Sequence, residues 1–211
     1  MKKKIMTLML AVSMVLALTA CGGNKINFEK GTTEGDVYTN ASIGIKATVP
    51  DGLSFADEAT VSEFEESAMS SLESTTNVSE EKLEEMASAM IYDAVIISDG
   101  GSSIQIAAEN MKITMGKKVS AETYLKSLES SSTAAYESMG CTVTFSGVDK
   151  VELGGKEFSH IDMTISISGM ELGQTCYAFA AGDYMYYMVV TDMGDATEQI
   201  AAFFDSFEAV E

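Results

Sequence analysis

The spacing of hydrophobic and polar residues changes several times along this chain. From residue 41 to residue 50 the two kinds alternate with period two, which is typical of a half-buried strand. Two helices are predicted next because apolar residues recur there at helical spacing. The first covers about residues 60–74, and the second begins at the N-cap Ser79 and continues to about Ile91.

A β-hairpin is predicted after these helices. Residues 93–97 and 103–111 have strand character, and Gly100 and Gly101 lie between them. Glycines at such a turn supply the positive φ that it requires. A phosphate-binding loop would instead lead into a helix, so the two glycines indicate a turn.

The second half of the chain begins with a third predicted helix, from Ser120 as its N-cap to about Met139, ended by Gly140. After Gly140 the period changes to two for about fifty residues. Five strands are predicted there, over residues 141–145, 148–153, 157–167, 174–180 and 184–191. A short helix over residues 195–206 completes the pattern.

These elements predict an α+β fold. Strands dominate the second half and helices interrupt the first, without the regular alternation of strand and helix that a parallel sheet requires. We therefore expect a mostly antiparallel sheet flanked by helices. The predicted folded domain covers residues 41–211, and residues 21–40, which are rich in Gly, Asn and Thr, are expected to form a flexible tether.

The first residues have the pattern of an export signal. Lys2, Lys3 and Lys4 precede an apolar run over residues 5–17, which is shorter than the roughly 20 residues of a membrane span. Small residues then lead to Cys21, in the sequence Leu-Thr-Ala-Cys of a bacterial lipobox. We expect residues 1–20 to be removed as a signal peptide.

A lipid on Cys21 would then hold the protein at the extracytoplasmic face of the cell membrane. The alternatives are an uncleaved membrane helix and a secreted protein whose cysteine lies there by chance. The membrane is therefore the first predicted partner.

Charge narrows the range of other partners. Without residues 1–20 the chain keeps 10 basic and 32 acidic residues, a net charge of −22. Nucleic-acid binding requires basic surfaces that displace counterions, and a polybasic grip on anionic lipid requires the same excess. Neither is expected, and the acidic residues are interpreted as a solvated surface.

Cys141 and Cys176 are the only cysteines beyond Cys21. An exported location permits a disulfide between them. The alternative is a pair of buried, unpaired thiols, since free cysteine is among the most buried residue types. The sequence leaves both open.

His160 is the only histidine, and strand alternation places it on the same face as Asp162. Such a pair could ligate a metal or transfer a proton. However, the sequence marks no further metal ligands, no Gly-x-Ser-x-Gly nucleophile motif and no cofactor motif. A structural histidine is the favoured interpretation, and a hydrolase or metal-dependent enzyme using His160 is the alternative.

Aromatic residues are concentrated in the last two predicted strands. They include Tyr177, Phe179, Tyr184 and Tyr186. Such side chains can line a groove for a ligand. The alternative is that they form a sheet face buried beneath helices.

Several short motifs together resemble those of PsbP-like domains, a group that includes an extrinsic photosystem protein, nuclear Ran-binding (Mog-type) relatives and many bacterial lipoproteins. Residues 43–53 (IGIKATVPDGL) are similar to the strand–Pro–x–Gly–Trp opening of that group, with Leu53 in place of the customary Trp. The helix start at residues 120–125, the hairpin at 151–158 and the last helix, which ends in Phe207, are similar as well. The resemblance implies an α/β/α sandwich and an accessory or binding role.

The sequence thus predicts a lipid-anchored, non-enzymatic module that binds a ligand or assists other proteins. Its ligand would be an unknown small molecule or protein. The alternative is an envelope stress or assembly factor that acts through protein contacts, for which an exposed apolar patch is expected.

Overall fold

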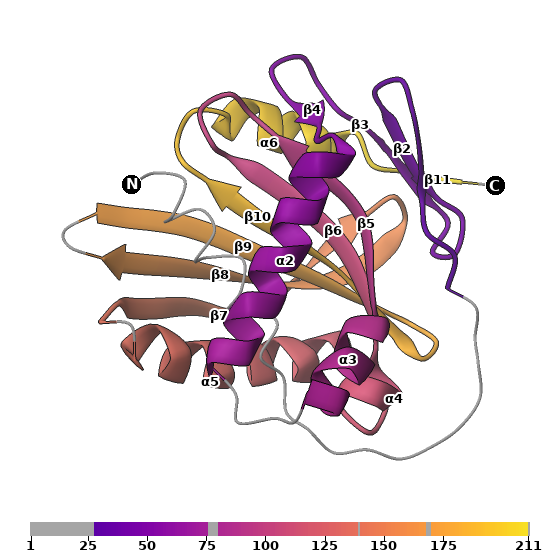
Figure 1. Cartoon of the computed structure of the whole chain (residues 1–211). Helices are drawn as coiled ribbons and strands as arrows, with labels where there is room; N and C mark the ends of the chain where they lie inside the picture. The colour runs from indigo at the N-terminus through magenta and orange to yellow at the C-terminus, as the bar shows by residue number, and fades with distance from the viewer. Residues whose placement is uncertain (1–27, 76–79, 139, 168–169, 211) are drawn as a thin grey trace.

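The computed structural model describes residues 28–75, 80–138, 140–167 and 170–210 (Figure 1). Within these ranges the chain forms two antiparallel sheets with helices packed on them. The predicted α+β fold class is therefore confirmed. The sequence pattern predicted one sheet, and the second sheet is a finding of the structure.

Seven strands form the larger sheet. In spatial order they are β4 (Ser54–Phe55), β5 (Met90–Ile97), β6 (Ser103–Asn110), β10 (Tyr184–Asp192), β9 (Met170–Ala181), β8 (Lys156–Ile167) and β7 (Thr142–Leu153). Every neighbouring pair is antiparallel. The predicted hairpin is confirmed as β5–β6, and the predicted strands over residues 141–145 and 148–153 form the single strand β7.

Four short strands form the smaller sheet. Their spatial order is β1 (Thr32–Glu34), β2 (Val37–Asn40), β3 (Ile45–Thr48) and β11 (Glu208–Ala209). Figure 1 shows this sheet beside one end of the larger one. The tether predicted for residues 21–40 is therefore wrong in its second half, because β1 and β2 pair with each other and β2 pairs with β3. Residues 21–27, like the signal peptide and Cys21, lie outside the described residues.

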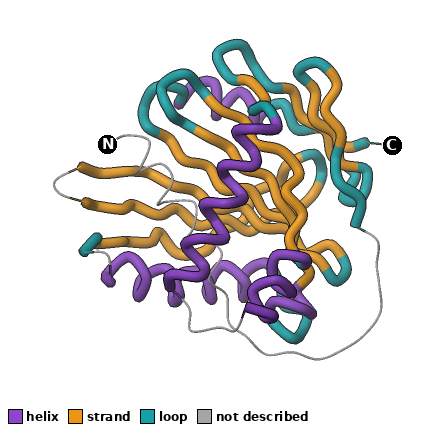
Figure 2. The backbone as a smooth tube through the Cα atoms, in the orientation of Figure 1, coloured by secondary structure: helices purple, strands orange, loops and turns teal. Residues whose placement is uncertain are grey.

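Helices flank the larger sheet (Figure 2). They are α2 (Glu58–Thr75), α3 (Glu80–Ser88), α4 (Met111–Thr114), α5 (Ala121–Ser138) and α6 (Thr197–Asp205). Helix α5 packs on β7, β8 and β9, α2 contacts β5, and α6 contacts β3 of the smaller sheet. The second predicted helix is too long, because its last residues, Met90 and Ile91, pair with β6 as part of β5. Its predicted N-cap, Ser79, lies outside the described residues.

Each face of the larger sheet carries its own core. On one face, residues of β6, β8, β9 and β10 pack beneath α5, with Leu125 and Leu128 from the helix fully buried. On the other face, the opposite residues of the same strands pack against the smaller sheet and α6, with Ile45 and Phe203 fully buried. The two cores arise because successive side chains of a strand point to opposite faces.

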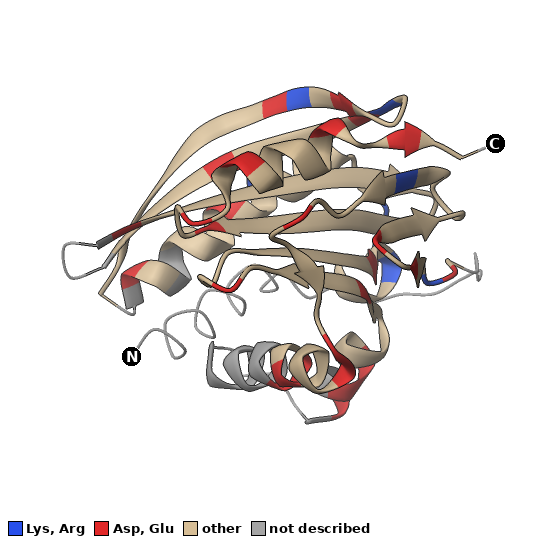
Figure 3. Ribbon diagram, turned by 90° about the horizontal axis from the view of Figure 1, so that it is seen from above, with Lys and Arg blue, Asp and Glu red and all other residues tan. Residues whose placement is uncertain are grey.

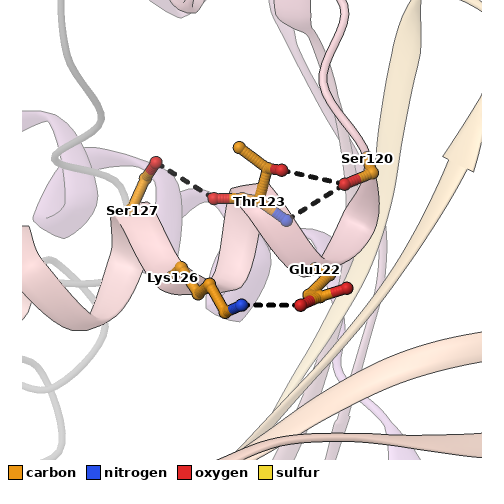
Figure 4. Close-up of polar contacts among 5 residues, drawn as sticks. All are labelled: Ser120, Glu122, Thr123, Lys126 and Ser127. Carbon is orange, nitrogen blue, oxygen red and sulfur yellow. Dashed lines mark hydrogen bonds and ion pairs between the residues drawn. The ribbon is translucent and has the colours of Figure 1, made fainter.

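The ends of α5 are determined by local sequence. The Ser120 hydroxyl accepts a hydrogen bond from the Thr123 backbone N–H at 3.2 Å, which confirms Ser120 as the N-cap (Figure 4). Lys126 Nζ lies 2.6 Å from Glu122 Oε1 one turn along. Gly140, with φ of 75°, follows the last turn, and this left-handed conformation favours glycine.

Bulges interrupt two strands of the larger sheet. In β5 the register shifts between Tyr92 and Ala94, so Asp93 is the inserted residue. In β7 the register shifts between Phe145 and Val148. A bulge redirects side chains and increases the local twist, and the β5 bulge places Asp93 and Ala94 toward the smaller sheet.

Cys141 and Cys176 are both buried free thiols in the core beneath α5. Cys176 pairs with Ile161 of β8, whereas Thr142, which follows Cys141, pairs with Ser166. These two positions of β8 lie roughly 17 Å apart along the strand, and a disulfide requires Cα atoms within about 7 Å. The disulfide alternative is therefore wrong, and the alternative of two buried thiols holds.

Candidate functional site

A cavity lies between the smaller sheet and the end of the β9–β10 hairpin. Its volume is about 500 Å³, which is within the range of ligand pockets. Its walls are formed by Phe28, residues 41–44, Lys156 and residues 179–182. We call this space the Lys156 cavity, because Lys156 is the one ionisable side chain in its lining.

Hydrogen bonds hold the first described residues against this cavity. The Glu29 backbone N–H donates to Ser42 Oγ at 2.8 Å, and the Ser42 hydroxyl donates to the Glu29 carbonyl at 3.1 Å. The Ile43 backbone N–H donates to Asn40 Oδ1 at 3.2 Å. These hydrogen bonds fix the turn between β2 and β3, and they hold Glu29 against that turn.

Phe28 joins this wall to the aromatic residues of β10. Its ring centroid lies 5.2 Å from that of Tyr184 and 6.4 Å from that of Tyr186. Phe28 itself is buried. The predicted aromatic groove therefore exists only in part. The ring of Tyr186 is buried in the core, and Tyr184 packs against Phe28 without lining the cavity.

The other two predicted aromatic residues have different roles. Phe179 lines the Lys156 cavity and packs against Phe158, with ring centroids 5.2 Å apart. Tyr177 instead lies between His160 and Phe204, with ring centroids at 5.5 and 4.5 Å. Of the four aromatic candidates, Phe179 alone lines this cavity.

His160 and Asp162 share a strand face, as predicted, but the structure gives them separate partners. His160 stacks on Tyr177, and its Nδ1 has no hydrogen-bond partner within the described residues. Asp162 accepts a hydrogen bond from the Thr175 hydroxyl at 2.7 Å. In the part of the chain that the structure describes, no group of three or more His, Cys, Asp or Glu side chains is placed to hold a metal ion.

A smaller cavity of about 300 Å³ lies between α2, β5 and the residues that lead into β1. Asp93 forms its buried end, and Glu58, Glu65 and Lys30 are the other charged residues in its lining. We call this space the Asp93 cavity. Its excess of carboxylates gives it the opposite charge to the Lys156 cavity.

Asp93 is only 5% exposed, and three donors converge on its carboxylate. The Gly31 backbone N–H donates to one oxygen, and the Tyr38 hydroxyl and Asn40 Nδ2 donate to the other, the last at 2.6 Å. Burial raises the pKa of Asp93, and these hydrogen bonds act in the opposite direction. The carboxylate thus ties the smaller sheet to β5.

A second buried carboxyl, that of Glu109, lies on the other face of the sheet beneath α5. It is 2% exposed and accepts hydrogen bonds from the hydroxyls of Thr114, at 3.0 Å, and Tyr124. Burial raises the pKa of Glu109 to about 7, against the lowering effect of these bonds. The nearby Tyr187 hydroxyl is buried and has no hydrogen-bond partner in the described chain.

Sequence reasoning missed the three charged residues Asp93, Glu109 and Lys156. Asp93 is the one charged residue between positions 90 and 97, and Glu109 is the one charged residue between positions 103 and 110. A charge within such a run is a usable signal, because buried charges need partners. Lys156 gave no such signal, since it follows a Gly-Gly turn and precedes a glutamate.

The structure assigns the chain to the class of α+β proteins, with two antiparallel sheets. No protein-family model matches the sequence, and no curated protein matches it. Within the described residues none of the helices is long and apolar enough to cross a bilayer.

Solved structures with a similar arrangement do exist. The chain is similar to cyanobacterial PsbP (CyanoP) from Synechocystis, with 12% identity and a TM-score of 0.47 over 91% of this chain and 98% of that one. It is similar to LpqN, involved in cell envelope biogenesis of Mycobacterium tuberculosis, with 10% identity and a TM-score of 0.42 over 79% and 83% of the two chains.

A third similar structure comes from Bacteroides thetaiotaomicron, with 8% identity and a TM-score of 0.41, over 85% of this chain and 50% of that one. One of the three structures is thus a PsbP protein, the group that the sequence motifs resemble. At these identities and TM-scores the likenesses say nothing about what this chain binds.

Proposed function

We propose that the protein is a lipid-anchored module of the extracytoplasmic membrane face, which binds a ligand in the Lys156 cavity without changing it chemically. The observation that carries this proposal is the place of the cavity in the chain. Phe28 forms part of its wall and follows the lipobox Cys21 by seven residues. Seven extended residues span at most about 25 Å, so a lipid on Cys21 would hold the cavity close to the bilayer.

The lining of the cavity supports binding in preference to catalysis. Acid–base and nucleophilic catalysis require two or more groups that converge on the reacting atoms. The Lys156 cavity offers one ionisable side chain and one hydroxyl, that of Ser42, which is hydrogen-bonded to the Glu29 backbone. His160, the one candidate for catalysis in the sequence, stacks on Tyr177 away from this lining.

Ligand binding is also favoured over an assembly role based on protein contacts. Such a role was expected to bring an exposed apolar patch. Among the described residues the one large hydrophobic side chain that is exposed is Met193, at 44%. A single side chain does not form a patch.

The anchor is tested by replacing Cys21 with Ser in the full-length chain expressed in a bacterial host. We expect the wild-type protein in the membrane fraction, labelled by a fatty-acid analogue, and the C21S variant to lose both the label and the membrane association. Cys176→Ser serves as the control, because that thiol is buried beneath α5. Continued lipid labelling of C21S would refute the proposed anchor.

A further inference from the structure

We infer that the Lys156 cavity binds an anionic membrane lipid, with the negatively charged head on Lys156 Nζ and the apolar part against Phe28 and Phe179. This inference rests on the proposed function, because it names the ligand class for the same cavity. Three observations support it: the charge of the lining, the location of the Lys156 side chain against the β2–β3 turn and the short distance in sequence from the cavity wall to Cys21.

Charge is the first observation. The chain has 32 acidic residues against 13 basic ones, and Figure 3 shows the acidic residues spread over several elements. The lining of the Lys156 cavity nevertheless contains a lysine and no carboxylate. An anion entering this cavity therefore meets a cation, whereas in the Asp93 cavity it would meet three acidic side chains.

Lys156 differs from five other lysines of the chain because it has no carboxylate as an ion-pair partner among the described residues. Ion pairs join Lys46 to Glu208, Lys112 and Lys118 to Asp183, Lys126 to Glu122, and Lys150 to Glu157. Within the described residues no carboxylate lies within ion-pair distance of Lys156, although its side chain is half-buried. A partly desolvated ammonium is stabilised by an anion.

The Lys156 side chain extends toward the β2–β3 turn, and the backbone that precedes it is closely packed. A Cβ atom on Gly44 would lie 3.9 Å from both Cε and Nζ of Lys156, so the end of this side chain lies against the β2–β3 turn. The β7–β8 turn that precedes Lys156 is held equally closely, since a Cβ on Gly154 would lie 2.9 Å from the Glu208 carbonyl oxygen. The end of the Lys156 side chain therefore reaches the turn that forms one wall of the cavity.

The rest of the lining suits the apolar part of a lipid. Phe28, Ile43 and Phe179 are the aromatic and larger aliphatic residues of the same lining as Lys156. Ligand pockets commonly combine such walls with a small number of polar groups that fix the orientation of the ligand. A head group alone would use Lys156 and leave these walls without a partner.

The predicted anchor favours the membrane as the source of this ligand. Phe28 is seven residues from Cys21, so the cavity would remain within about 25 Å of the lipid attachment point. A membrane lipid would lie within that reach, whereas a free anion of the same charge would have to be captured from solution. The expected ligand is therefore an anionic phospholipid.

Native mass spectrometry of the mature lipidated protein in detergent tests this inference. The probes are phosphatidylglycerol, phosphatidylcholine with the same chains, and glycerol phosphate as the head group alone. We expect wild type to bind phosphatidylglycerol at least tenfold more tightly than the other two probes. Lys156→Gln should reduce that affinity at least tenfold, and Lys156→Arg should retain most of it.

Lys150→Gln is the matched control, because Lys150 lies on the neighbouring strand, is exposed and pairs with Glu157. It should bind like wild type. Circular dichroism melts establish that each variant is folded. If Lys156→Gln does not fold, the binding of phosphatidylglycerol by Lys156→Arg provides the test.

The other outcomes separate this inference from the proposed function. The anionic ligand would be overturned if wild type bound phosphatidylcholine as tightly as phosphatidylglycerol, or if Lys156→Gln bound phosphatidylglycerol as tightly as wild type. The proposed binding module would stand in either case. Equal binding of glycerol phosphate would overturn the lipid. Absence of any adduct on the folded wild type, as isolated and with all three probes, would overturn the inference and the binding function together.

Discussion

The two faces of the larger sheet bury a carboxyl each, and they stabilise it in different ways. Asp93, on the side of the smaller sheet, receives hydrogen bonds from three donors that come from three positions of the N-terminal segment. Glu109, beneath α5, receives hydrogen bonds from two hydroxyls and is otherwise surrounded by apolar and tyrosine side chains.

The different hydrogen-bond partners indicate how each carboxyl contributes to the fold. Asn40 uses its Oδ1 to accept from Ile43, so its Nδ2 can only donate to Asp93. With Gly31 also donating, the arrangement favours an ionised Asp93, and the charge itself attaches the smaller sheet. Glu109 has a pKa of about 7 because of burial, so this core holds a proton over much of the acidic pH range.

Loss of the Asp93 carboxylate is expected to have the largest effect. In Asp93→Asn an amide NH₂ group replaces one of the two carboxylate oxygens. This group cannot accept the hydrogen bonds of the donors that it faces. Buried donors left without an acceptor cost about 1–3 kcal/mol each, so we expect the free energy of unfolding to fall by about 3 kcal/mol.

Urea denaturation followed by circular dichroism measures this loss. Asp149→Asn is the control, because Asp149 is an exposed residue of β7, and it should change stability by less than about 0.5 kcal/mol. Equal stability of Asp93→Asn and wild type would show that the carboxylate does not attach the smaller sheet.

Glu109→Gln is expected to change the pH dependence of stability. The pKa of Glu109 is raised from 4.5 to about 7 in the folded state, so the folded protein binds this proton more tightly than the unfolded chain does. Stability therefore falls as the pH rises from about 4.5 to about 7, by about 3 kcal/mol at 1.36 kcal/mol per pKa unit.

The neutral glutamine removes this loss, so the variant should gain stability relative to wild type as the pH rises through this window. Urea titrations at pH 5 and pH 8 provide the comparison, with Glu152→Gln on the exposed side of β7 as the control. A constant difference between Glu109→Gln and wild type at the two pH values would contradict the prediction.

The smallest effect is expected for Tyr187→Phe. The Tyr187 hydroxyl is buried without a hydrogen-bond partner among the described residues, so its removal relieves a desolvated polar group and leaves the ring in place. Stability should stay unchanged or rise by up to about 1 kcal/mol.

Tyr38→Phe is the matched comparison for this prediction, because the Tyr38 hydroxyl donates to Asp93. It should lose about 1.5–3 kcal/mol, as expected for a hydrogen bond to a charged group. Similar changes in the two variants, measured by thermal and urea unfolding, would remove the distinction between the two faces.

The elements that the sequence predicted well are those whose own residues determine them. The helix α5 has its N-cap at Ser120 and its stop at Gly140, and both signals act within a few residues. The β5–β6 hairpin and β8 to β10 show a period of two over long runs. Local spacing is sufficient for such elements because they present a continuous apolar stripe to a core.

Apart from β3, which lies within the predicted strand over residues 41–50, the smaller sheet could not be predicted in this way. Residues 32–40 are mostly polar and give no strand period of their own. They form strands because β2 pairs with β3 and because Tyr38 reaches Asp93, 55 residues further along the chain. Contacts between such distant residues are not visible in local spacing.

The same reason limits the prediction of the candidate site. Phe179 was identified from the aromatic strands, but the Lys156 cavity is assembled from segments near residues 28, 42, 156 and 180. The sequence gives the chemistry of each segment and not their proximity. His160 was singled out by its rarity, although rarity does not indicate what surrounds a residue.

The edge strand β7 has a consequence for contacts between copies of the protein. It is the last strand of the larger sheet, paired on one side only with β8. An unpaired edge is a template for another chain, and encounters between copies become more frequent as the protein concentration rises. The bulge between Phe145 and Val148 bends this edge, and Asp149, Lys150 and Glu152 stand exposed along it. A second chain approaching in extended form thus meets a kinked, charged border, which opposes the addition of a strand.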